Sequence, residues 1–125
     1  MSDSRFRTWM AYRKGFTLAK DIYQVSENFP KSERYSLTDQ IRRSSRSVCA
    51  NLGEAYGKRA YPKHFYAKLT DCIAENFETQ VWLDFALSYK YVSRSEYFDL
   101  RTRSEEVGRL LSYMSTNPEK YTANP

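Results

Sequence analysis

The chain has 125 residues, of which 41% are hydrophobic and 28% charged, and its formal net charge is +5. With only four glycines and four prolines, this composition argues against disorder and against a turn-rich all-β fold. The sequence contains neither a membrane-spanning apolar run nor the apolar core of a signal peptide. We therefore expect one cytoplasmic domain over residues 1–125 that makes no contact with a membrane.

The first predicted helix covers about residues 5–27. Apolar residues recur there at intervals of three and four, which is typical of an amphipathic helix. These residues are Trp9, Tyr12, Phe16, Ala19, Ile22 and Tyr23. The helix should end before Pro30, because proline disfavours helical geometry in the residue that precedes it.

A second helix is predicted over about residues 36–58, and Ser36 with Asp39 resembles an amino-terminal cap. Its core-facing stripe comprises Leu37, Ile41, Ser45, Val48, Leu52 and Ala55. Other positions on this helix hold residues small enough for another backbone to approach closely. They are Ser44, Ser47, Ala50 and Gly53.

The third helix is predicted over about residues 62–91. Pro62 suits a first turn, where a missing N–H loses no helical hydrogen bond. The apolar pattern predicts a core stripe of Phe65, Leu69, Cys72, Ile73, Phe77, Val81, Asp84 and Leu87, continuing to Tyr91.

A fourth helix is predicted over about residues 94–115, where Ser93 and Glu96 have the spacing of a capping box. Its apolar face comprises Tyr97, Leu100, Val107, Leu110, Leu111 and Met114. The links between the four helices are short, which favours antiparallel neighbours. The predicted fold is therefore all-α, an antiparallel up-down-up-down four-helix bundle.

Basic and aromatic residues gather on the second helix and just after it. Cationic side chains neutralise phosphates and tyrosine rings stack on unpaired bases, so this pattern indicates a nucleic-acid-binding surface. The candidate residues are Arg42, Arg46, Tyr56, Lys58, Arg59, Tyr61 and Lys63. In the alternative interpretation, the tyrosines cover the end of the core and the arginines form salt bridges with Asp39, Glu75 or Glu78.

Catalysis has little support in the sequence, and we expect no enzyme, cofactor or metal. His64 is the sole histidine, and neither Cys49 nor Cys72 has an evident base beside it in the sequence. The four glycines are scattered and do not form a phosphate-binding loop.

Three segments together resemble one known family. They are FPKSERYSLTDQIRRSSRSVCANLGEAYGKR (29–59), AENFETQVWLDFALSYKY (74–91) and EEVGRLLSYM (105–114). They resemble the four-helix bundle proteins named for the intervening sequences of 23S ribosomal RNA genes. The resemblance implies a left-handed antiparallel bundle that assembles as a cyclic homo-oligomer, a pentamer. A related bundle that assists the reverse transcriptase of diversity-generating retroelements binds nucleic acid.

The resemblance also gives a meaning to a polar stripe on the second helix. Family members carry the same residues there, which implies a network that sets an interface between subunits. The network residues are Gln40, Arg43, Asn51, Glu54 and Glu78. Two other interpretations remain open, in which these side chains are solvated at the surface or line a ligand pocket.

Taken together, the sequence predicts a non-enzymatic, oligomeric helical bundle that binds RNA or another nucleic acid through a basic surface. An RNA-bound protein is a second possible partner. The alternative is a protein-interaction or scaffold module with no nucleic-acid role, whose basic residues only keep it in solution. Salt distinguishes the two, because polyanion binding weakens steeply with ionic strength.

Overall fold

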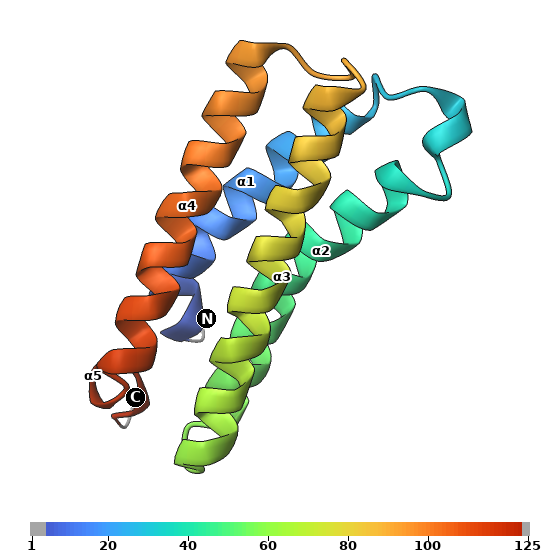
Figure 1. Cartoon of the computed structure of the whole chain (residues 1–125). Coiled ribbons are helices and arrows are strands. Elements are labelled where there is room, and N and C mark those ends of the chain that lie inside the picture. The colour runs from blue at the N-terminus through green and yellow to red at the C-terminus, as the bar shows by residue number, and fades with distance from the viewer. Residues whose placement is uncertain (1–4, 124–125) are drawn as a thin grey trace.

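The computed structural model describes residues 5–123, and this part of the chain forms a helical bundle without strands (Figure 1). The four long helices are α1 (Met10–Ser26), α2 (Leu37–Gly57), α3 (Pro62–Ser88) and α4 (Arg94–Thr116). The short elements are the 3₁₀ helices η1 (Arg5–Thr8) and η2 (Lys31–Glu33) and the last helix α5 (Glu119–Thr122). The prediction of an all-helical chain is confirmed.

Each long helix packs against the next one along the chain, and α1 also packs against α4. One core therefore lies between all four. The N-terminal segment and α5 lie at the same end of the bundle (Figure 1). An aromatic cluster packs against the core at this end. Trp9 is its centre, with its ring 5.9 Å from that of Tyr56, 6.4 Å from that of Phe65 and 5.7 Å from that of Tyr121.

The predicted core stripe of α2 is confirmed, since all six of its residues are buried. Ser45 fits among apolar neighbours because its hydroxyl donates to the carbonyl of Arg42, 3.2 Å away. A polar side chain satisfied by its own helix adds no unpaired group to the core.

The predicted stripe of α3 is confirmed at Phe65, Leu69 and Cys72 and wrong at Phe77, Val81 and Asp84, whereas Ile73, Leu87 and Tyr91 are partly buried against the core. Phe77 and Val81 are 60% and 47% exposed. The buried residues follow an alternating spacing of four and three, which keeps one face of a helix toward a partner. They are Phe65, Leu69, Cys72, Asn76, Thr79, Leu83 and Ala86.

Hydrogen bonds explain why two polar residues of α3 take core positions. The Asn76 amide donates to the carbonyl of Ser104 at 2.9 Å, and the Ser104 hydroxyl donates back to Asn76 Oδ1 at 3.0 Å. The hydroxyls of Thr79 and Ser44 lie 2.8 Å apart. Because these groups are paired, burying them does not leave an unsatisfied donor or acceptor.

A similar shift occurs on α1. Trp9, Ala19 and Ile22 are buried as predicted, but Ala11 and Leu18 are also buried, whereas Phe16 and Tyr23 from the predicted stripe are 49% and 44% exposed. These two aromatic residues thus lie beside the core, on the surface between α1 and α2.

The predicted helix ends have mixed outcomes. The capping box at α4 is confirmed, with Ser93 Oγ accepting from the N–H of Glu96 and Glu96 Oε1 accepting from the N–H of Ser93. Ser36 is the N-cap residue of α2 as predicted, but its side chain makes no capping hydrogen bond. Its hydroxyl donates to Glu33 Oε1, which also accepts from the N–H of Leu37. Helix α3 ends at Ser88, three residues earlier than expected.

The early end of α3 has a backbone cause. Lys90 has a φ of 63°, a left-handed conformation that terminates many helices. The N–H of Tyr91 then bonds to the carbonyl of Ala86 at 2.8 Å, which satisfies one of the last carbonyls of the helix.

Replacing Phe65 and Phe77, two of the three phenylalanines of α3, tests its register. Phe65 is 1% exposed, so Phe65→Ala should lower the free energy of unfolding by about 3–5 kcal/mol. Phe77→Ala should change it by no more than about 0.5 kcal/mol, as for other surface substitutions. Urea denaturation at low protein concentration measures both, and an equal loss in the two variants would show the register of α3 to be wrong.

Candidate nucleic-acid interface

Two arginines of α2 face α1 without an acidic partner. Arg42 Nε donates to the hydroxyl of Ser26 at 2.7 Å, and its guanidinium lies 3.9 Å from the centre of the Tyr23 ring. Arg46 Nε donates to the carbonyl of Arg42 at 3.1 Å. Within residues 5–123 neither arginine forms a salt bridge, and neither does the exposed Lys20 of α1 nearby. Positive charge on this side is therefore uncompensated.

Five cations on the other faces of the bundle are paired with carboxylates within the described residues. Arg43 contacts Glu75 at 3.1 Å and also contacts Glu78, both on α3. The other pairs are Lys14 with Glu106, Lys68 with Glu54 and Asp71, Arg101 with Glu105, and Arg103 with Asp21 and Asp99. Arg94 and Arg109 of α4 form no salt bridge within the described residues either, so the α1–α2 side differs in grouping its unpaired cations around Tyr23.

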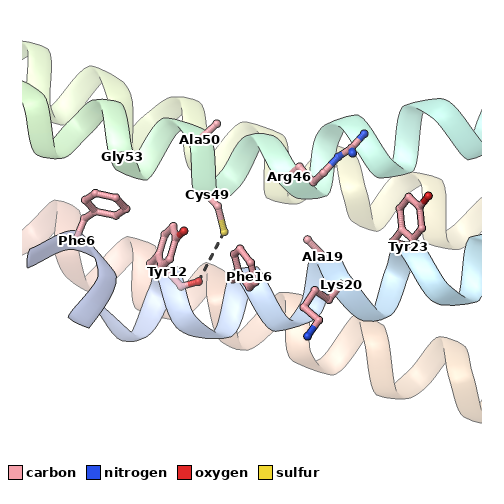
Figure 2. A pocket seen from close by; sticks show the side chains of 10 residues that line it. All are labelled: Phe6, Tyr12, Phe16, Ala19, Lys20, Tyr23, Arg46, Cys49, Ala50 and Gly53. Carbon is pink, nitrogen blue, oxygen red and sulfur yellow. Dashed lines mark hydrogen bonds between the residues drawn. The ribbon is translucent and has the colours of Figure 1, made fainter. Parts of the chain in front are cut away.

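A groove of about 530 Å³ runs along this same side, and we call it the α1–α2 groove (Figure 2). Four aromatic residues, four small residues and two cations line it. They are Phe6, Tyr12, Phe16, Tyr23, Ala19, Cys49, Ala50, Gly53, Lys20 and Arg46. In Figure 2 the aromatic rings of η1 and α1 point toward α2, and the Arg46 guanidinium lies at the end of the groove near Tyr23.

Small residues on α2 create the groove. A Cβ added at Gly53 would meet no atom within 4 Å, so no other backbone approaches there. The expectation that Ala50 and Gly53 serve close packing is therefore not met within this chain. Ser44 does serve it, because it is fully buried against α3.

The other predicted nucleic-acid residues lie near the link between α2 and α3. Arg59 lies 3.6 Å from the centre of the Tyr56 ring, and Tyr56 also contacts Phe6 and Trp9. Tyr56 is therefore already covered on one face. Tyr61 is 60% exposed, and the lysines at positions 58 and 63 are exposed as well.

The predicted binding residues thus fall into two groups. Arg42 and Arg46 lie along the α1–α2 groove, whereas the other five lie at the end of the bundle. Arg42 and Lys58 are sixteen positions apart on the α2 axis, which is about 24 Å. The sequence analysis missed Lys20 and the aromatic residues of the groove, because it assigned Tyr12, Phe16 and Tyr23 to the core and gave Phe6 no role. One feature of the sequence could have indicated the groove: α1 carries more apolar residues than a single core-facing stripe needs.

The predicted polar network divides into two clusters on the seam between α2 and α3. Arg43 Nε donates to Gln40 Oε1 at 3.1 Å and the guanidinium reaches Glu78, whose carboxylate also accepts from Trp82 Nε1 at 3.0 Å. Asn51 and Glu54 instead meet Lys68, at 3.4 and 2.8 Å. The sequence analysis did not identify Lys68 or Trp82 as members.

The environment of Glu78 shifts its acidity. Partial burial raises the pKa of this carboxyl group, but the hydrogen bond from Trp82 and the ion pair with Arg43 outweigh it, and the pKa lies below its ordinary value. Glu78 is therefore held in its charged form, which is the form that Arg43 binds.

Nucleophilic chemistry has little basis in the described residues. Burial raises the pKa of the Cys49 thiol to about 12 and that of Cys72 further still, so both remain protonated at neutral pH. Within residues 5–123 no group of three His, Cys, Asp or Glu side chains could hold a metal ion, and no helix could cross a membrane.

Removing the charge of Glu78 should reduce stability at neutral pH and flatten its acid dependence. A lowered pKa stabilises the fold above the ordinary value of 4.5, and this contribution is lost as pH falls through the lowered pKa. Glu78→Gln should cost less than about 1 kcal/mol, because the pair is partly exposed. Urea denaturation across acidic pH measures this effect, with the exposed Glu119→Gln as control. An unchanged pH profile in Glu78→Gln would contradict the prediction.

Comparison with known proteins places the chain in a family. The sequence pattern of the 23S rRNA-intervening sequence protein family matches residues 7–113. A crystal structure from Bacteroides thetaiotaomicron, of a protein with unknown function from the S23 ribosomal protein family, has a TM-score of 0.77 and 25% identity. The match covers 85% of this chain and 95% of that one. No curated protein matches the chain. The chain therefore belongs to the 23S rRNA-intervening sequence protein family.

Proposed function

We propose that this chain is a non-enzymatic, cytoplasmic, single-domain bundle that binds nucleic acid through the basic side formed by α1 and α2. The observation that carries the proposal is the pairing pattern of neighbouring arginines. Arg43 contacts two carboxylates, whereas Arg42 and Arg46 contact none. A surface that leaves several cations without acidic partners attracts polyanions.

Binding would be electrostatic and independent of sequence. Arg42 and Arg46 neutralise phosphates and release condensed counterions, and the basic residues at the end of the bundle extend the same path. Tyr61 is sufficiently exposed to stack on a base, whereas Arg59 already covers the ring of Tyr56. RNA is the nucleic acid to test first, because the family description refers to 23S ribosomal RNA.

We also propose that the up-down-up-down, left-handed bundle assembles as a cyclic homo-oligomer, a pentamer as the family resemblance implies. An exposed apolar row on α3 supports self-association: Phe77, Val81, Phe85 and Tyr89 are each 42–60% exposed. Such a row is costly to leave in water and marks an interaction surface. The Arg43–Glu78 cluster lies beside it and would border the interface.

The same row also supports the second candidate function, a scaffold module that binds another protein and has no nucleic-acid role. Such an apolar contact would change little with salt, whereas phosphate binding weakens steeply. A repeated basic surface in a ring would strengthen nucleic-acid binding through avidity, so self-association and nucleic-acid binding are compatible.

The double variant Arg42→Ala/Arg46→Ala tests the nucleic-acid surface. It should weaken binding to a structured RNA with a single-stranded loop and lower the slope of log Kd against log salt by about 1.4. Fluorescence anisotropy over a salt series measures both quantities. The matched control is Arg94→Ala/Arg109→Ala, which removes two exposed cations from α4 that form no ion pair within the described residues. Equal losses in both double variants, or none in either, would contradict the proposed surface.

The variant Phe77→Asp tests self-association through α3. A carboxylate in the apolar row should shift the protein toward the monomer, because burying an unpaired charge in an interface is costly. Sedimentation velocity measures the subunit number. The control is Tyr35→Asp, which changes an aromatic residue that is 85% exposed in the link before α2. A monomeric wild type, or an unchanged assembly in Phe77→Asp, would exclude the α3 row as the interface.

A further inference from the structure

We infer that the α1–α2 groove receives an unpaired nucleobase, so that the protein prefers single-stranded to double-stranded nucleic acid. This inference rests on the proposed function and assigns a second role to the same side of the bundle. The arginines there contact phosphates, and the groove beside them contacts bases.

The composition of the groove favours a base over the apolar face of a partner protein. Its lining contains no carboxylate and no branched aliphatic side chain. Aromatic rings interleaved with cations are typical of proteins that bind single strands, where rings stack on bases and cations follow the phosphates. The other class of occupant is an amphipathic helix of a partner protein, which the experiment below distinguishes.

The rings are placed so that a base can lie on them. Phe16 is 49% exposed and Tyr23 is 44% exposed, although both border the core. The ring centres of Tyr12 and Phe16 are 5.9 Å apart and the rings are tilted by 35°. A base inserted between the two rings would need a stacking distance of about 3.4 Å on each side, and together these exceed the separation of the ring centres. A base would therefore lie over the exposed ring of Phe16 and not between the two rings.

The cations lie at the rim of the groove, where the backbone of a bound strand would run. In Figure 2 the Arg46 guanidinium lies on the α2 side of the groove near Tyr23, and the Lys20 amine points away from α2. Arg42 covers one face of the Tyr23 ring, 3.9 Å from its centre. A strand with its bases turned inward would therefore place its phosphates beside Arg42 and Arg46.

Single-strand preference follows from what the groove requires. In a duplex the faces of the bases are stacked on each other and only their edges are accessible in the grooves. Arginines at the rim would contact the phosphates of either form. The groove would contribute only when a base is unpaired, and stacking on an aromatic ring strengthens binding measurably for each base.

The experiment compares three probes that have the same number of phosphates: a short single-stranded RNA without self-complementarity, the same strand with abasic sites, and an RNA duplex. Anisotropy should show the intact single strand binding at least about five-fold tighter than the abasic strand. The duplex should resemble the abasic strand.

Two variants locate the contact, each with a matched control. Phe16→Ala removes an aromatic ring and Gly53→Leu fills the groove without changing charge, and both should abolish the preference for the intact strand. Phe98→Ala removes a ring that is also 49% exposed but lies on α4. Gly57→Leu changes a second α2 glycine at which an added Cβ meets no atom within 4 Å. Both controls should keep the preference, with circular dichroism confirming that every variant folds.

The outcomes separate this inference from the proposed function. Equal binding of all three probes, with a steep salt dependence, would overturn the base contact and leave the electrostatic surface intact. No binding at low salt would overturn both. If the preference for the intact strand survives Phe16→Ala and Gly53→Leu, the groove is excluded as the base site. If Gly53→Leu changes the number of subunits and Gly57→Leu does not, the groove is assigned to a protein interface.

Discussion

The rotation of α3 about its own axis is the constraint on which the rest of the surface depends. Two buried hydrogen-bonded contacts fix it, one between Asn76 and Ser104 and the other between Thr79 and Ser44. A buried polar group that lost its partner would cost about 1–3 kcal/mol, so α3 has little freedom to turn. With this rotation Glu75 faces α2, and the apolar row that begins at Phe77 faces outward.

The position of those acids decides which cations of α2 stay uncompensated. Arg42 and Arg43 are consecutive, so they point about 100° apart around the helix. Arg43 meets carboxylates of α3, whereas Arg42 meets a serine and a tyrosine ring of α1. One helix thus has a neutralised side and a positive side. The moderate net charge of the chain understates how strongly the positive charge is concentrated.

The apolar side chains outside the core fall into two groups of different chemistry. The row on α3 combines phenylalanines with Val81, and its side chains are 42–60% exposed. It suits contact with another apolar surface. The α1–α2 groove combines aromatic rings with cations and lies against small residues such as Gly53. The two surfaces therefore differ in chemistry: the first supports the proposed self-association, and the second supports the proposed contact with nucleic acid.

The sequence by itself determined the helices and the face that α2 buries, because spacing, proline positions and the Ser93–Glu96 box are local properties. Tertiary structure decided the register of α3, the openness of the α1–α2 groove and the pairing of each arginine. The sequence analysis predicted Phe77 in the core from its hydrophobicity alone. No pattern within one helix reveals that Asn76, the residue before it, has a hydrogen-bond partner on α4 and is buried instead. Ion pairs and buried hydrogen bonds join residues distant in sequence, and they form only after the helices have packed.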